Sequence, residues 1–531
     1  MILHLRDLRN ELAGLKVSVG QRRLLLEEAE QHKATIQAAV DGDLKNELAE
    51  LKVSIARYSL LLKEAEQREA AVQAALDAYI FPVLTLPLEI TTEIFLHYAF
   101  AVHEEDRHGP RLSCRDILLL TTICRAWRRL ALSVPGLWST FDVWTVPRLW
   151  SIIDVGDFLV WGIQEKMEEI VHTWFSRAGA MPLSLIGWMG PIESKGSGAI
   201  NAILRRYAPR FSDLHICVTE PGLVSNLLDN ISFPWLQSLN LCNLADGGPG
   251  TPSPPPLPIS TFRESPRLRH LNLERIPLVS LEGIRWELLE SFATHEISPQ
   301  ECLDVLCKSP SLLKFEFYGS KENSYAADQR VISHSTLATF HLLNNNCEIM
   351  RHLTLPALRV LSFHLQELDD DDFLPFLSRS RGELTSFAFY SLRLGPLVLS
   401  MLWFQHMTHL TSLSLSELEA QSRTNVLRAL NRHHDPGFLP ALADLTLVDW
   451  KSDQVDAQLA DALDSRCTAT EVEDGRMQLK AFDFIWMDAG PYTADLALLT
   501  SLIDDYRVVL EDWKMRGLEV YIGTEEKNYF G

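Results

Sequence analysis

The sequence predicts a mixed α and α/β fold: an N-terminal helical coiled coil or hairpin, a short helical module, and a long irregular α/β solenoid. Three observations carry this prediction. A 32-residue segment near the start is repeated at an offset of 36 residues. Apolar residues between positions 79 and 145 recur at helical spacing, and a short apolar pattern returns ten times from Leu236 onward.

Residues 1–78 contain two copies of one helical segment. Positions 10–41 and 46–77 share 20 identities, and apolar residues recur within each copy in alternating steps of three and four. This spacing is typical of a coiled-coil seam. Gly42 can end the first helix and turn the chain into a hairpin, whereas a continuous helix would also keep the seam in line. The arm is therefore predicted either to self-associate or dock a partner, or to pair only with itself.

Residues 79–145 are expected to form a compact helical module. In "LPLEITTEIF", Pro87 suits the first turn of a helix and Glu89 favours its dipole. In "DILLLTTICRAWRRLALSVPGLW", a later helix ends at Pro135. Its apolar face is formed by Leu120, Ile123, Cys124, Trp127, Leu130 and Ala131.

These two stretches, in this order, resemble the F-box, a three-helix module. With the preceding coiled coil they are most similar to a large group of fungal F-box proteins, although the insertion "AVHEEDRHGPRLSC" between the halves departs from the shortest F-boxes. The resemblance implies docking on the adaptor Skp1, membership of a cullin-type ubiquitin ligase, and capture of a protein substrate by the rest of the chain. It places eight residues at or just beneath the adaptor surface: Leu86, Pro87, Ile90, Ile94, Leu118, Leu120, Cys124 and Trp127. The alternative is that most of them form only the core of the module.

After a helical connection at 146–180, residues 181–531 are predicted to form a degenerate leucine-rich repeat-like solenoid. The pattern L-x-x-L-x-L, with other apolar residues allowed at its later positions, starts first at Leu236 and last at Leu479, with successive starts 21 to 37 residues apart. Each copy predicts a short strand followed by a return segment. Ile276, Leu418 and Trp450 stand where the regular repeat has Asn or Cys, and a Pro-rich insertion at 246–260 should be extended. The alternative is an ordinary α/β or β-sandwich domain.

In a solenoid, the side chains that alternate with the buried ones would face outward from the sheet. Their mixture of aromatic, basic and acidic types suits protein recognition, and the other interpretation is a solvated face without a ligand. The candidate substrate-binding residues are Arg269, His270, Lys314, Tyr318, His341, His364 and Tyr390.

The amino-acid composition indicates which classes of binding partner are disfavoured. The chain has 49 Lys and Arg against 70 Asp and Glu, a net charge of −21, which disfavours nucleic acid. Its eight cysteines are scattered without a C-x-x-C pair, and no stretch reaches the length of a membrane span. We therefore expect a cytoplasmic and/or nuclear protein that binds neither nucleic acid nor membrane.

The sequence predicts no catalytic site and no cofactor-binding site. The common nucleotide-binding, hydrolase and zinc-protease motifs are missing, and no metal or other cofactor is expected. The run "DDDD" at 369–372 should be solvated charge. The F-box resemblance therefore implies a non-enzymatic substrate-recognition subunit of a Skp1–cullin–F-box ubiquitin ligase. The alternative is a coiled-coil scaffold or sensor that acts independently of ubiquitin.

Overall fold

The computed structural model divides the 531-residue chain into two compact units, Met1–Ile94 and Phe95–Gly531, each considered by itself. It describes residues 2–38, 45–77, 86–101, 114–142, 158–189, 195–218, 228, 231–243, 261–276, 278, 283–319, 331–343, 347–365, 368–380, 382–391, 398–416, 418–448, 457–467, 478–486, 507–524 and 527–528.

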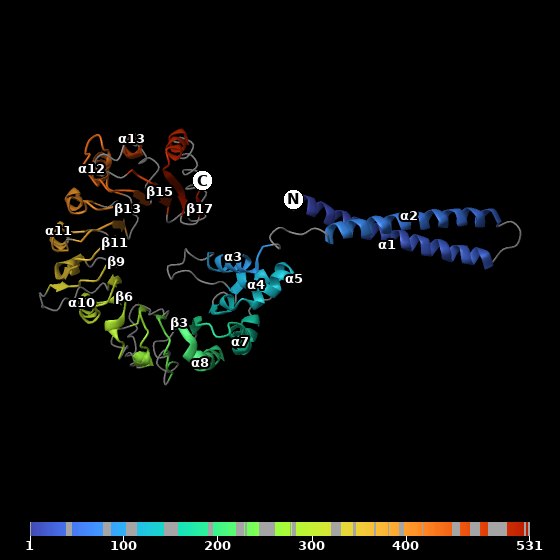
Figure 1. Ribbon diagram of the computed structural model, residues 1–531, viewed down its shortest axis with the longest axis horizontal. Coiled ribbons are helices and arrows are strands. Elements are labelled where there is room, and N and C mark those ends of the chain that lie inside the picture. Colours follow the sequence, from blue (N-terminus) through green and yellow to red (C-terminus); the bar gives the residue numbers. More distant parts are fainter. Residues whose placement is uncertain are drawn as a thin grey trace. The chain divides into compact units, whose positions relative to one another are not determined.

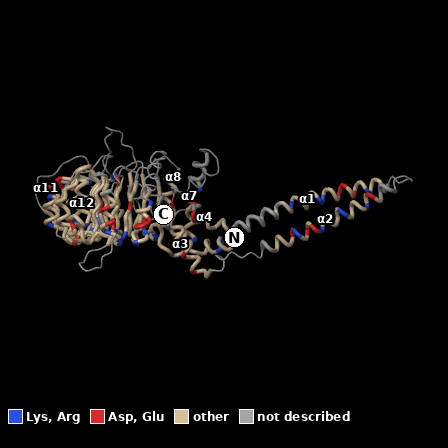
Figure 2. The backbone as a smooth tube through the Cα atoms, turned by 90° about the horizontal axis from the view of Figure 1, so that it is seen from above, with Lys and Arg blue, Asp and Glu red and all other residues tan. Residues whose placement is uncertain are grey.

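The first unit is dominated by two long helices, α1 (Ile2–Ala38) and α2 (Lys45–Asp77), which pack antiparallel along their length (Figure 1). An Nη of Arg22 donates to the carbonyl of Leu61 at 2.9 Å, and Arg23 forms an ion pair with Glu66 at 2.5 Å. Acidic and basic residues follow one another along both helices (Figure 2). Of the two predicted arrangements, the structure therefore has the hairpin; Gly42 lies outside the described residues.

Helix α3 (Leu88–Ala101) crosses the division between the units, and α4 (Cys114–Ile123), α5 (Arg125–Ser133) and the 3₁₀ helix η3 (Pro135–Trp138) follow it. The thiol of Cys124 caps α5 by accepting the Trp127 N–H at 3.4 Å. The Phe95 and Trp127 rings meet edge to face with centroids 4.8 Å apart. The indole N–H of Trp138 donates to the carbonyl of Ala131 at 2.7 Å, which ties η3 to α5.

The second unit is built on one sheet of fifteen strands that follow one another in chain order. Every neighbouring pair in it is parallel except β16–β17. A separate parallel pair consists of β8 (Ile332–Ser333) and β10 (Leu353–Thr354). The strands of the large sheet are β1 (Thr140–Asp142), β2 (Leu183–Met189), β3 (Phe211–Val218), β4 (Ser238–Asn243), β5 (His270–Glu274), β6 (Ser291–Ile297), β7 (Lys314–Gly319), β9 (Thr339–Leu343), β11 (Val360–Leu365), β12 (Ser386–Ser391), β13 (Ser412–Ser416), β14 (Asp444–Val448), β15 (Ala481–Trp486), β16 (Glu519–Thr524) and β17 (Lys527–Asn528).

Helices cover one face of this sheet, and within this unit Figure 1 shows the strands along the inside of a curve with the helices outside it. The apolar core lies between the two layers, where Phe315 stacks on Phe292 and Phe340 of the neighbouring strands. The connecting helices are α7 (Phe158–Arg177), α8 (Lys195–Tyr207), η4 (Ala208–Arg210), η5 (Thr261–Glu264), η7 (Trp286–Leu288), α10 (Pro299–Lys308), η8 (Cys347–His352), α11 (Asp370–Arg379), η9 (Met401–His406), α12 (Ala420–Leu430) and α13 (Ala457–Cys467).

Each of the ten copies of the apolar pattern contains a strand that begins two residues after its first Leu, as in β4 after Leu236 and β15 after Leu479. The alternative expectation was an ordinary α/β or β-sandwich domain; the large, mostly parallel sheet with helices on one face differs from a β-sandwich and belongs to the α/β class. The sheet begins earlier than position 181, because β1 at Thr140–Asp142 pairs with β2. The first three strands escaped detection because none of them starts the Leu-based pattern; β3 opens with Phe211 instead.

Candidate protein-interaction surfaces

Strand register arranges the outward side chains of the parallel sheet in rows that cross it, and we call the two most polar rows the sheet face. Because side chains alternate along a strand, residues two apart on one strand belong to adjacent rows. One row contains His215, Asn240, Asn272, Ala293, Glu316, His341, Ser362, Ala388, Ser414, Thr446 and Asp483. The next contains Cys217, Cys242, Glu274, His295, Tyr318, Leu343, His364 and Tyr390.

Aromatic and imidazole rings pair across strands within the second row. His295 stacks on Tyr318 with centroids 3.6 Å apart and planes inclined by 11°. His364 lies 4.6 Å from Tyr390, whose hydroxyl donates to the Ser414 Oγ at 2.8 Å. These contacts hold flat, half-buried rings on the sheet, and such amphipathic rings are enriched at protein interfaces.

The seven predicted substrate-binding residues are therefore divided. Four of them, Tyr318, His341, His364 and Tyr390, lie in the two rows of the sheet face, and His270 and Lys314 lie at the first position of β5 and β7 in the preceding row. Arg269 precedes β5, where its guanidinium donates to the carbonyls of Pro266 and Leu268 and pairs with Glu290 at 3.5 Å. It lies at the entry to the strand rather than in the rows.

The prediction missed His295 and Glu274 on the sheet face. Both could have been found by continuing the alternation two residues beyond the outward-facing Ala293 and Asn272. Their strands run past the end of the L-x-x-L-x-L pattern, which stops at Thr294 in β6.

Burial shifts the pKa values of two groups in the first row. Desolvation lowers the pKa of His341, against the opposing effect of Glu316. Desolvation also raises the pKa of Asp483, because burial disfavours its carboxylate and Asp444 and Glu519 carry like charge. Both shifts favour neutral side chains, which can donate and accept hydrogen bonds with less desolvation cost than ions.

Two carboxamide oxygens of the sheet face have no hydrogen-bond partner in the described part of the chain. They are Oδ1 of Asn240 and Oδ1 of Asn272, which are register partners on β4 and β5. Buried acceptors of this kind normally have a partner. An N–H or O–H group of a ligand or of a water molecule would satisfy them.

Exposed apolar side chains also occur on two of the helices that precede the sheet, and each helix is considered by itself. In α3, Ile90, Ile94 and Tyr98 follow one another at steps of four and have relative exposures of 49%, 41% and 36%. In α4, Leu118 and Leu119 are 38% and 49% exposed, and Ile123 ends the same helix with 54%. Exposed apolar stripes of this size on short helices are typical of interaction sites.

The eight residues predicted at the adaptor surface also divide by exposure. Those that are exposed are Leu86, Pro87, Ile90, Ile94 and Leu118. Leu120 is 3% exposed and belongs to the core, while Cys124 caps α5 and Trp127 packs against Phe95. The last three residues are thus explained by the packing of the helices themselves.

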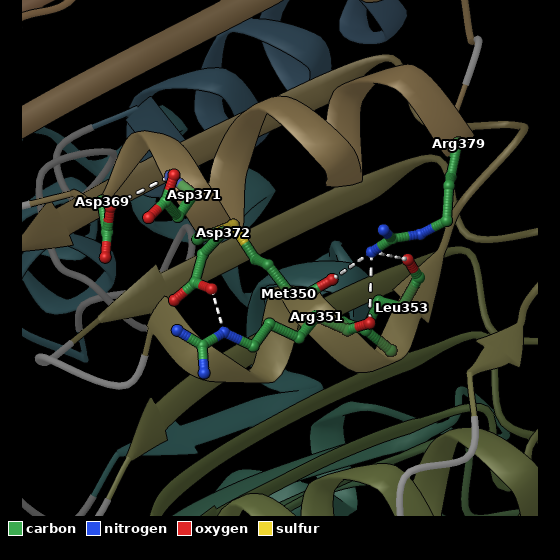
Figure 3. Close-up of polar contacts among 7 residues, drawn as sticks. All are labelled: Met350, Arg351, Leu353, Asp369, Asp371, Asp372 and Arg379. Atoms are coloured by element: carbon green, nitrogen blue, oxygen red, sulfur yellow. Dashed lines mark hydrogen bonds and ion pairs between the residues drawn. The ribbon is translucent and has the colours of Figure 1, made fainter.

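Three of the four carboxylates in the acidic run at 369–372 make specific contacts at the start of α11, and one of these, Asp372, is buried. Asp369 is the N-cap of α11 and accepts the Asp371 N–H at 2.9 Å, and Asp372 is only 2% exposed (Figure 3). Asp370 accepts the indole N–H of Trp403 at 2.6 Å. The expectation of solvated charge is therefore wrong for Asp372. Among the described residues, no group of three or more His, Cys, Asp or Glu is arranged to hold a metal ion.

Together these features define an α/β protein with a helical hairpin, exposed apolar helices and a large parallel sheet that has one open polar face. No protein-family model, curated protein or solved structure was found to match the chain. Within the described residues, none of the helices combines the length and the hydropathy needed to cross a membrane.

Proposed function

We propose that the chain is a non-enzymatic substrate receptor of a Skp1–cullin–F-box ubiquitin ligase. In this proposal α3, α4 and α5 form the F-box and dock a Skp1-type adaptor, and the sheet, as a leucine-rich repeat-like solenoid, binds a protein substrate. The observation that carries the proposal is the exposure of apolar side chains on α3 and α4, in the two segments that resemble the F-box.

Exposing apolar side chains to water costs free energy. Ile90, Ile94, Leu118 and Leu119 leave large apolar surfaces in water although the adjoining Phe95 and Ile117 are fully buried. Covering such side chains stabilises a complex by about 25 cal/mol for each Å² of apolar surface removed from water. An adaptor with an apolar groove would supply that cover.

The sheet face supports the second half of the proposal. It offers paired rings, as in His295 with Tyr318, beside the acceptor oxygens of Asn240 and Asn272. Rigid rings beside hydrogen-bonding groups are the features that protein interfaces use to fix a partner.

Binding of a purified Skp1-type adaptor to the full chain tests the proposal directly. Ile90→Asp places a charge where an apolar contact is proposed, and we expect it to weaken binding at least about tenfold, or by about 1.4 kcal/mol. Leu402→Asp is the matched control, because Leu402 in η9 is also 49% exposed but lies outside the proposed F-box. Binding measured by calorimetry should be unchanged in the control.

Two outcomes would contradict the assignment. One is the failure of the wild-type chain to bind the adaptor, and the other is equal loss of affinity in both variants. Pro87→Ala combined with Ile90→Asp should abolish binding completely, because both substitutions fall in the segment that opens the F-box resemblance.

A second candidate function, a coiled-coil scaffold independent of ubiquitin, is favoured by one observation on the hairpin. Val17 and Leu24 of α1, and Val53 and Leu60 of α2, occupy equivalent positions in the two copies and are 59% to 70% exposed. Their spacing of seven residues could form a further seam with another chain. Removal of residues 1–78 should lower the oligomeric mass of a scaffold, whereas a monomeric receptor would keep its state.

A further inference from the structure

Two cysteines of the sheet face lie opposite each other on neighbouring strands. Cys217 of β3 and Cys242 of β4 are register partners in the parallel ladder. Adjacent strands are about 4.7 to 4.9 Å apart, and a disulfide joins Cα atoms separated by about 4.4 to 6.8 Å. The Cα separation of this pair therefore falls within the range that a disulfide bridges.

Polar groups on both sides give the two thiols different roles. The Cys217 sulfur lies 3.3 Å from Nε2 of His215, and the Cys242 thiol donates to Oε2 of Glu274 at 3.2 Å. The adjacent Cys242 thiol and, after it, His215 lower the pKa of Cys217 to about 6 against the opposing effect of burial, while the adjacent Cys217 and burial raise the pKa of Cys242. Because Cys242 donates its proton to Glu274 and Cys217 adjoins His215, Cys217 is the thiol of the pair that ionises more readily.

We propose that Cys217 and Cys242 form a dithiol site that a hydroperoxide oxidises to a disulfide. The Cys217 thiolate attacks one peroxide oxygen, so that an S–O bond forms, the O–O bond breaks, and the departing hydroxide takes a proton from solvent. Cys242 then transfers its proton to Glu274, and its sulfur attacks that of Cys217. The S–S bond forms, the S–O bond breaks, and the second hydroxide takes the proton held by Glu274.

The step is balanced in atoms and electrons. With hydrogen peroxide, two thiols and one peroxide give one disulfide and two water molecules, and the two electrons lost by the sulfurs reduce the peroxide. A dithiol reductant reverses the change by thiol–disulfide exchange. The thiolate is the reactive form of cysteine, so Cys217 attacks the peroxide before Cys242 does.

The low exposure of the two thiols favours oxidation by small molecules. Cys217 and Cys242 are 4% and 3% exposed, so a peroxide can approach the sulfurs more readily than a bulky reagent. Cys307, by contrast, is exposed, and Cys302 is fully buried. The chain therefore contains its own comparison cysteines for the experiment.

Peptide mapping of the reduced full-length protein after treatment with hydrogen peroxide tests the site. We expect the peptides that contain Cys217 and Cys242 to be joined and to be two hydrogen atoms lighter than their sum, and dithiothreitol should separate them. Cys307→Ser should leave this linkage unchanged. Both thiols remaining free at a peroxide dose that oxidises Cys307, or a linkage between other cysteines, would overturn the proposal.

Single substitutions separate the two roles. Cys242→Ser removes the resolving thiol, so a sulfenic acid at Cys217 should accumulate and be trapped by dimedone. His215→Gln should slow oxidation of Cys217 several-fold, whereas the histidine control His270→Gln should not. Trapping at Cys242 in the Cys217→Ser variant at the wild-type rate would show that the assignment of roles is wrong.

Discussion

Arg351 of η8 donates through Nε to the carboxylate of Asp372 in α11, and only 3% of the Asp372 side chain is exposed, against 54% for Arg351 (Figure 3). The same helix is held at its other end by Arg379, whose Nη2 donates to the carbonyls of Met350 at 2.9 Å and Arg351 at 3.2 Å. The two guanidinium groups therefore fix α11 against η8 at both ends.

Asp372→Ala should lower the free energy of unfolding by about 1 to 3 kcal/mol, because it removes the buried partner of Arg351 and leaves a small void. The matched control is Asp371→Ala, since Asp371 is exposed and adjoins Asp372 in the same turn. We expect the control to change stability by less than about 0.5 kcal/mol. Urea denaturation of both variants measures the difference, and equal effects would show that the buried pair contributes nothing specific.

The ion pair between Arg351 and Asp372 could not be predicted from the sequence pattern. A run of four aspartates is usually solvated, and nothing local distinguishes Asp372 from its neighbours. The difference arises because Arg351, twenty-one residues earlier, is brought opposite one of the four carboxylates. A contact at that separation depends on the packing of η8 against α11, which the sequence does not reveal.

The ten strands of the Leu-based pattern, in contrast, could be predicted well from sequence because each carries its own signal. Leu239 and Leu241 of β4 point to the core, and Ser238 and Asn240 alternate with them. Period-two alternation is a local pattern, so it can be recognised in the sequence without knowledge of the rest of the fold. The pairing of Cys217 with Cys242 could not be predicted in this way, because it depends on the register between two strands.

Arg466 should be among the most important polar residues for stability in the second unit. It is 1% exposed, and its guanidinium donates to the carbonyls of Leu430, Leu439 and Phe438 at 2.6, 3.1 and 2.7 Å. Burial lowers its pKa to about 10, so it stays charged at neutral pH. These bonds tie α13 to the C-terminal end of α12 and to the loop that follows it.

We expect Arg466→Ala to destabilise the protein by about 3 to 5 kcal/mol, because three buried carbonyl groups would lose their donors. Arg466→Lys should have a smaller effect, since it retains the charge but not the planar fork. Arg428→Ala on the exposed side of α12 is the control. Thermal unfolding of the three variants should rank them in this order, and a neutral Arg466→Ala would refute the structural role.

The start of α10 offers a test of a local interaction. Ser298 Oγ accepts the Glu301 N–H at 3.2 Å, and the Glu301 carboxylate accepts the Ser298 N–H at 2.9 Å, which forms a reciprocal capping box. Ser298→Ala should lower stability by about 1 kcal/mol. The exposed Ser335 provides a control, and Ser335→Ala should be neutral. Equal midpoints of urea unfolding for the two variants would contradict the cap.

The titration of Cys217 predicts how stability depends on pH. Its pKa is lowered to about 6 in the folded chain, from an ordinary value of 9.0, because Cys242 and His215 favour the thiolate more strongly than burial and Glu274 oppose it. Between these values the unfolded chain binds more protons than the folded chain, so the free energy of unfolding rises with pH across this window. The contribution is lost as pH falls through about 6.

The slope from this single thiol can be at most about 1.4 kcal/mol per pH unit. Cys217→Ser removes the titrating group, so its free energy of unfolding should rise less steeply with pH than that of the wild type. The upper half of this pH window is the decisive part. Histidines are neutral there in both the folded and the unfolded chain, so they do not contribute to the slope. Urea unfolding of reduced protein at several pH values gives both slopes. Parallel lines for the two proteins would mean that Cys217 is not a thiolate in the folded chain.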